Sequence, residues 1–173
     1  MIGTAIWAAA LLAGAQAVAT PPPADLRQPG NVVKALQQAG YRAEMKLNDA
    51  GEPYVLSAAN GEPFTVDFYE CAGLKDCKSF QFRAWFRKEP MFTAALANEW
   101  NRMNRFLKIA VDVEGNLQQY LDATAVGGVT QAQFAELLLW YTEMDGALAR
   151  FLAAKRDAAK AATPTPPPAR SRR

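Results

Sequence analysis

The chain contains no histidine, and this absence excludes much of the chemistry that proteins commonly perform. Histidine is the commonest general base and the commonest metal ligand, and its charge changes near neutral pH. The chain has three serines, Ser57 and Ser79 within strand patterns and Ser171 near the C-terminal end, and none of them has an imidazole to activate it as a nucleophile. We expect no catalytic residue, no metal and no cofactor, and the sequence predicts that the protein is not an enzyme.

Cysteine is almost as scarce, because Cys71 and Cys77 are the only two in the chain. Their five-residue spacer is not the C-x-x-C of a redox motif, and no further cysteine or histidine could complete a zinc site. Apolar and polar residues alternate in Phe64–Glu70 and again in Ser79–Phe86, so the cysteines should flank the turn of a β-hairpin. The sequence predicts a structural disulfide there in preference to a redox or metal pair.

Charged side chains are absent from residues 1–19, MIGTAIWAAALLAGAQAVA. The segment ends in a small-x-small pattern, Ala17-Val18-Ala19, and a proline-rich linker over residues 20–30 follows it. This pattern predicts a signal peptide that is cleaved after Ala19, and hence a periplasmic or secreted protein. An uncleaved inner-membrane anchor is the alternative, because the uncharged run approaches the ~18 residues that a membrane span needs.

The net charge of +2 is too small to indicate a nucleic-acid-binding protein, but it is unevenly distributed. Residues 20–149 hold sixteen acidic and twelve basic side chains, whereas residues 150–173 hold one acidic and seven basic. Residues 153–173 change from Ala/Lys-rich to Pro/Arg-rich, which predicts a fraying helix followed by a disordered tail of extended polyproline geometry. Weak attachment of this basic tip to an anionic lipid or cell-wall polymer is the alternative.

Hydrophobic periodicity predicts nine elements between the terminal segments. A short helix with Asn31 as its N-cap comes first, Pro90 opens a second helix, and a capping box of Thr130 and Gln133 opens a long third helix. The predicted strands are Tyr41–Leu47, Pro53–Ala58, Phe64–Glu70, Ser79–Phe86, Phe106–Val113 and Leu117–Ala123. The order α-β-β-β-β-α-β-β-α predicts one α+β domain over residues 31–152, an antiparallel sheet with helices packed against it.

One series of residues in this domain identifies a protein family. Each residue is common by itself, but their order along the chain is distinctive. The series consists of NEWNR at 98–102, Arg105-Phe106, Asp112, Gly115, Asp122, Gly127-Gly128 and FTVDFYEC at 64–71. The series resembles the YbjN family, bacterial proteins labelled sensory-transduction regulators. The resemblance implies the fold of type III secretion chaperones, small α+β domains that commonly pair through helix or sheet surfaces. The family supplies no agreed catalytic residues, so none is carried over.

Four residues are candidates for binding a partner: Trp85, Trp100, Asn101 and Arg105. Trp85 should be exposed, since it lies on the strand face opposite the phenylalanines, and tryptophan and arginine are frequent in binding hot spots. For Trp100, which shares a helical stripe with Leu96, the sequence favours a core position over a ligand contact. Helix capping is the alternative for Arg105.

The sequence therefore predicts a non-enzymatic, chaperone-like or regulatory module that binds a peptide or protein partner outside the cytoplasm, with a homodimer as one option. No nucleic-acid partner is expected. One alternative is a structural envelope protein that an uncleaved anchor or the basic tail holds in place. A second alternative is an unrecognised hydrolase.

Overall fold

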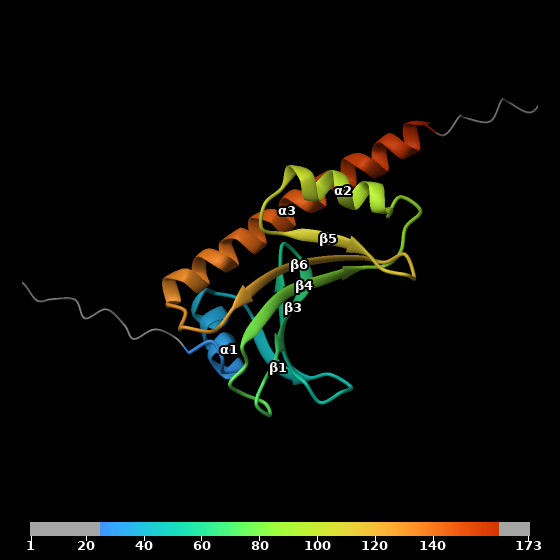
Figure 1. The fold of residues 1–173 in the computed structure, drawn as a ribbon. Coiled ribbons are helices and arrows are strands. Elements are labelled where there is room, and N and C mark those ends of the chain that lie inside the picture. The colour runs from blue at the N-terminus through green and yellow to red at the C-terminus, as the bar shows by residue number, and fades with distance from the viewer. Residues whose placement is uncertain (1–24, 163–173) are drawn as a thin grey trace, which may run out of the picture.

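Six antiparallel strands and three helices form the fold in the computed structural model, which describes residues 25–162 (Figure 1). The helices are α1 (Pro29–Gln38), α2 (Ala94–Met103) and α3 (Gln131–Ala162). The strands are β1 (Ala43–Leu47), β2 (Pro53–Ala59), β3 (Glu62–Tyr69), β4 (Ser79–Phe86), β5 (Lys108–Val111) and β6 (Leu117–Thr124). The predicted α+β class and element order are confirmed. The predicted signal peptide (1–19), residues 20–24 of the predicted linker and residues 163–173 lie outside the described residues.

The strands lie in the order β1-β2-β3-β4-β6-β5, and each neighbouring pair is antiparallel. The turn between β2 and β3 consists of Asn60 and Gly61, with φ angles of 52° and 86°. Asparagine and glycine adopt this left-handed conformation more readily than other residues, and two such residues in succession suit the right-handed twist of a hairpin. The Asn60-Gly61 pair is thus a local sequence signal for this reversal.

One face of the sheet carries the core, because alternate side chains of each strand point to the same side. Phe82 of β4 is fully buried and stacks on Tyr141 of α3, with the ring centroids 5.1 Å apart. The apolar residues that α3 buries repeat at helical spacing: Phe134, Leu138, Tyr141, Leu148 and Leu152. The helices thus cover this face of the sheet and leave the opposite face to solvent or ligands in the described part of the chain (Figure 1).

Several predicted boundaries are wrong, and side-chain hydrogen bonds explain two of them. α1 begins before Asn31, whose side-chain amide donates to the carbonyl oxygen of Asp25 instead of capping the helix. α2 begins after Thr93, not at Pro90, because the Thr93 hydroxyl accepts the backbone N–H of Leu96 at 3.2 Å.

Strand β5 is shorter than the predicted Phe106–Val113. Phe106 has a φ angle of 57°, a left-handed conformation that cannot continue a strand, so β5 starts only at Lys108. The strand ends at Val111, and the following turn leads into β6.

Helix α3 continues past Leu152 to Ala162, so the Ala/Lys-rich residues after Leu152 extend the helix, as their sequence predicts. Its start is as expected: the N–H of Gln133 donates to the Thr130 hydroxyl at 3.1 Å, and the Thr130 N–H donates to the Gln133 side chain at 2.9 Å. The predicted capping box is confirmed. Within residues 25–162, no helix has the length and apolar character needed to span a membrane.

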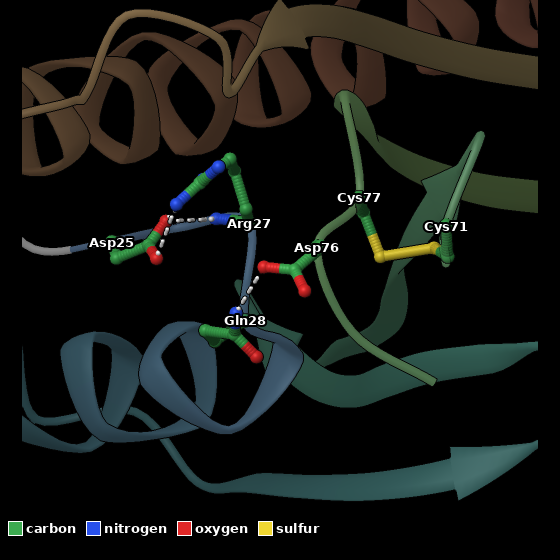
Figure 2. Close-up of a disulfide and its surroundings, with 6 residues drawn as sticks. All are labelled: Asp25, Arg27, Gln28, Cys71, Asp76 and Cys77. Atoms are coloured by element: carbon green, nitrogen blue, oxygen red, sulfur yellow. Dashed lines mark hydrogen bonds and ion pairs between the residues drawn. A yellow bond between two sulfur atoms is a disulfide. The ribbon is translucent and has the colours of Figure 1, made fainter. Parts of the chain in front are cut away.

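Cys71 and Cys77 form a disulfide in the loop between β3 and β4 (Figure 2). This loop also holds the chain segment that leads into α1. The N–H of Cys77 donates to the Arg27 carbonyl oxygen at 2.9 Å, and the Gln28 side chain donates to Asp76 at 2.7 Å. The disulfide loop therefore attaches the start of the described chain to the sheet.

Candidate functional site

The open face of the sheet contains a groove of about 680 Å³ over β2, β3 and β4. The turn between β1 and β2 forms one of its walls. Its floor consists of residues that alternate with the buried core positions: Tyr54, Leu56, Thr65, Asp67, Tyr69, Arg83 and Trp85. We take this groove, the open-face groove, as the candidate site, since a concave surface with aromatic rings and a few polar groups is the usual form of a binding site.

Arg83 organises the polar part of the groove. Its guanidinium lies 3.5 Å from the Asp67 carboxylate, donates to the Gln118 side-chain oxygen at 2.9 Å and stacks over the Trp85 ring at 4.7 Å. These contacts come from three residues, one each on β3, β4 and β6, and they fix the guanidinium before any ligand is present. A side chain that is already ordered loses little conformational entropy when a ligand binds.

Three aromatic side chains give the groove its apolar contact area: Tyr54, Tyr69 and Trp85. Trp85 is 55% exposed, which is unusual for so large an apolar side chain. Burial raises the pKa of the Tyr69 phenol, and the nearby Asp67 carboxylate raises it further, so Tyr69 is neutral at physiological pH. The Tyr69 ring can therefore act as an uncharged stacking surface.

Carboxylates outnumber cations in the lining of the groove. Asp49, Glu52 and Asp67 line it together with a single cation, Arg83. Asn48 shapes the turn that carries two of these acids, because its side-chain oxygen accepts the N–H groups of Ala50 and Glu52. The groove therefore favours a ligand with positive charge near its apolar contact surface.

The four predicted partner-binding residues do not come together. Trp85 lies in the groove, whereas Trp100, Asn101 and Arg105 lie on α2 or directly after it. Trp100 is 2% exposed, packs on Phe151 and donates its indole N–H to the Leu107 carbonyl oxygen at 3.1 Å. Trp100 is therefore part of the core.

Asn101 occupies the free edge of β5. Its side-chain amide donates to the carbonyl oxygen of Ile109 and accepts the Ile109 N–H, each at 2.9 Å. An unpaired edge strand is a template for association, and this contact covers part of that edge. Arg105 is exposed and stacks over the ring of the adjacent Phe106 at 4.8 Å.

A second polar cluster is buried under α3 on the covered face. Gln119 donates to the Tyr141 hydroxyl at 3.0 Å and to Asp145 at 2.7 Å, while Asn60 donates to Asp145 at 2.8 Å and to the Thr142 carbonyl oxygen at 3.0 Å. Burial raises the pKa of Tyr141, so its phenol stays neutral. The cluster connects α3 with β6 and with the β2–β3 turn, which is a structural role.

Sequence reasoning singled out only Trp85 among the residues that line the groove. Tyr54, Tyr69, Asp67 and Arg83 carry the same signal, because the strand alternation already places them opposite the buried face. What the alternation could not indicate is that the β1–β2 turn rises beside this face and makes it concave. Among residues 25–162, no three acidic or cysteine side chains are arranged to hold a metal ion.

Comparison with known proteins finds a family. Residues 29–152 match the profile of YbjN, described as "Putative bacterial sensory transduction regulator". The match spans most of the chain and every strand of the sheet. No curated protein and no solved structure matches the chain.

Proposed function

Because the chain belongs to the YbjN family, whose description is that of a regulator and not of an enzyme, we propose that it binds an extended segment of a protein partner in the open-face groove. We further propose that it does so outside the cytoplasm, as a secreted or periplasmic protein. The compartment is supported by the Cys71–Cys77 disulfide and by the apolar segment at residues 1–19. A regulator acts by binding, and the groove is the surface of the described chain best suited to it.

The observation that carries the proposal is the exposure of Trp85 beside an ordered guanidinium. An exposed tryptophan that stacks on a fixed arginine gives a rigid surface for a ligand, and both residue types are frequent in binding hot spots. An extended peptide can contact several side chains of the groove floor at once, while the side of its backbone that faces away from the groove stays hydrated.

The test is a selection of peptides from a random displayed library against the immobilised protein. We expect the selected peptides to bind the unmodified protein and to lose at least tenfold in affinity, about 1.4 kcal/mol, on the variant Trp85→Ala. Leu139→Ala is the matched control, because Leu139 is an exposed apolar residue on α3, away from the groove. Peptides that bind both variants equally well would place the binding surface elsewhere and refute the proposal.

A further inference from the structure

We propose that the open-face groove binds residues 163–173 of a second copy of this chain, so that two copies associate through a segment rich in proline and arginine. This inference rests on the proposed function, since it uses the same groove, and it names the ligand class: a proline-rich peptide with positive charge at one end.

The sequence of the segment, TPTPPPARSRR, supplies the first argument. It contains four prolines and three arginines and no acidic residue. Proline-rich sequence favours the polyproline II conformation, which is already extended and therefore loses little entropy when it binds. Such segments are recognised by grooves lined with aromatic rings.

The groove provides the rings and has the right dimensions. Tyr54, Tyr69 and Trp85 line it over three adjacent strands, β2 to β4. Tyr69 lies opposite Ser79, six residues from Trp85 along β4, so the rings extend over ~20 Å at ~3.3 Å per residue. Eleven residues of polyproline II, the length of residues 163–173, would extend over ~34 Å at ~3.1 Å per residue. A segment of this length is therefore long enough to reach from Tyr69 to Trp85.

The backbone of the groove floor also favours proline. β2, β3 and β4 each pair with a strand on both sides, so their backbone groups are largely committed to the sheet. A ligand on this face must be held by side chains and not as an added strand. Proline has no backbone N–H to leave unsatisfied, and its ring packs against aromatic faces.

Charge selects this segment over the other proline-rich stretch of the chain. Residues 20–24, TPPPA, contain three prolines but no charged side chain. Arg170, Arg172 and Arg173 complement the carboxylates of the groove, among them Asp49 and Glu52 in its wall.

The course of α3 indicates a second copy as the source of the segment. α3 lies on the covered face, and its C-terminal end projects past α2 and away from β1 and β3 (Figure 1). Residues 163–173 follow directly on Ala162. The last described residue of α3, Ala162, thus belongs to the helix on the covered side, opposite the groove, and reciprocal exchange of the following segment between two copies would close a dimer.

Sedimentation velocity of the full-length protein over a concentration series tests the association. We expect the sedimentation coefficient to rise with concentration and to reach the value of a dimer, and we expect 0.5 M salt to weaken this rise. The variant with Arg170, Arg172 and Arg173 changed to Glu, and the variant Trp85→Ala, should each remain monomeric. The control variant Leu139→Ala should associate like the unmodified protein. If the unmodified protein is a monomer at every concentration, the assignment of the segment to a second copy is wrong.

A labelled peptide of residues 163–173 tests the contact itself. Its fluorescence anisotropy should rise on titration with the triple Arg→Glu variant, whose own segment no longer competes, and Trp85→Ala in that background should weaken binding at least tenfold. Absence of peptide binding overturns this inference. If the library peptides still bind and depend on Trp85, the proposed function stands even though residues 163–173 are not the ligand. If neither the library peptides nor the labelled peptide binds at Trp85, the proposed function is wrong as well.

Discussion

Asn60 joins two parts of the molecule that are far apart in the sequence. Its left-handed backbone forms the turn between β2 and β3, and its side-chain amide donates to Asp145 and to the Thr142 carbonyl oxygen of α3. The residue thus has a local role in the turn and a long-range role in docking the helix. Two substitutions can separate these roles.

We expect Asn60→Gly to lower the free energy of unfolding by about 1–3 kcal/mol, because it removes hydrogen bonds to α3, one of them to a carboxylate. Asn60→Ala should lower it by roughly 1–2 kcal/mol more, since alanine is strained in the left-handed conformation that glycine adopts freely. Urea unfolding of the two variants and the unmodified protein measures both effects. Equal stabilities of the two variants would show that backbone strain at residue 60 is negligible.

Trp85 and Trp100 show how one residue type serves two purposes in this fold. The first lies exposed in the groove, and the second is almost fully buried with its indole N–H bonded to Leu107. Truncation of Trp100 should therefore destabilise the fold, whereas truncation of Trp85 should affect binding. Experiments on partner binding should use Trp85 for this reason.

At the level of elements, two ion pairs hold the C-terminal half of α3. Lys155 contacts Glu99 of α2 at 2.6 Å, and Arg156 forms two parallel bonds to Glu89, at 2.6 and 2.9 Å, just before α2. α2 lies beside this half of the helix (Figure 1). These contacts help to explain why α3 continues past Leu152, where apolar periodicity ends.

The Glu89–Arg156 pair predicts a pH dependence. The hydrogen bonds from Arg156 hold the pKa of the Glu89 carboxyl below its ordinary value. A carboxyl whose pKa is lower in the folded state than in the unfolded state stabilises the fold above its unfolded pKa, and this contribution is lost as the pH falls through the folded pKa. The stabilisation is thus present at neutral pH and absent in strong acid.

We expect Glu89→Gln to lower the free energy of unfolding at pH 7 by about 0.5–1 kcal/mol, the range for a partly exposed ion pair. The difference from the unmodified protein should vanish as the pH falls below the pKa of Glu89. Glu114→Gln, at an exposed turn, is the matched control and should change little at either pH. Unfolding curves at both pH values provide the measurement, and a difference that persisted in acid would assign the effect to packing.

At the level of the whole molecule, the disulfide loop connects the N-terminal segment with the sheet. Leu26 is fully buried, and Cys77 and Asp76 bind the backbone of Arg27 and the side chain of Gln28 (Figure 2). The disulfide closes a short loop, which limits the freedom of the unfolded chain and fixes the position of these partners. Loss of the disulfide should therefore affect both global stability and the local attachment of residues 25–28.

We expect the double substitution of Cys71 and Cys77 by Ala to lower the free energy of unfolding by about 2 kcal/mol, the chain-entropy value for so short a loop. Exchange of the backbone amide at position 77, which donates to the Arg27 carbonyl oxygen, should accelerate by more than exchange in the β4–β6 pairing. Reduction of the native protein should reproduce both effects. Uniform acceleration would mean that the disulfide stabilises the fold without holding the N-terminal segment.

The order of the elements and the face on which each strand residue lies could be predicted from the sequence, because both depend on local spacing. Side chains alternate along a strand with a period of two, and a helical stripe repeats every 3.6 residues, so Phe82 and Tyr141 were identifiable as core positions. The capping box at Thr130 and the turn at Asn60 also depend only on neighbouring residues.

Only the tertiary structure decided the roles that depend on distant partners. Trp100 is buried because Phe151 covers it, and Asn101 blocks the edge of β5 because α2 lies beside Ile109. The groove exists because all three helices leave the face around Arg83 uncovered while the β1–β2 turn rises beside it. Contacts of this kind join residues tens of positions apart, and local periodicity carries no information about them.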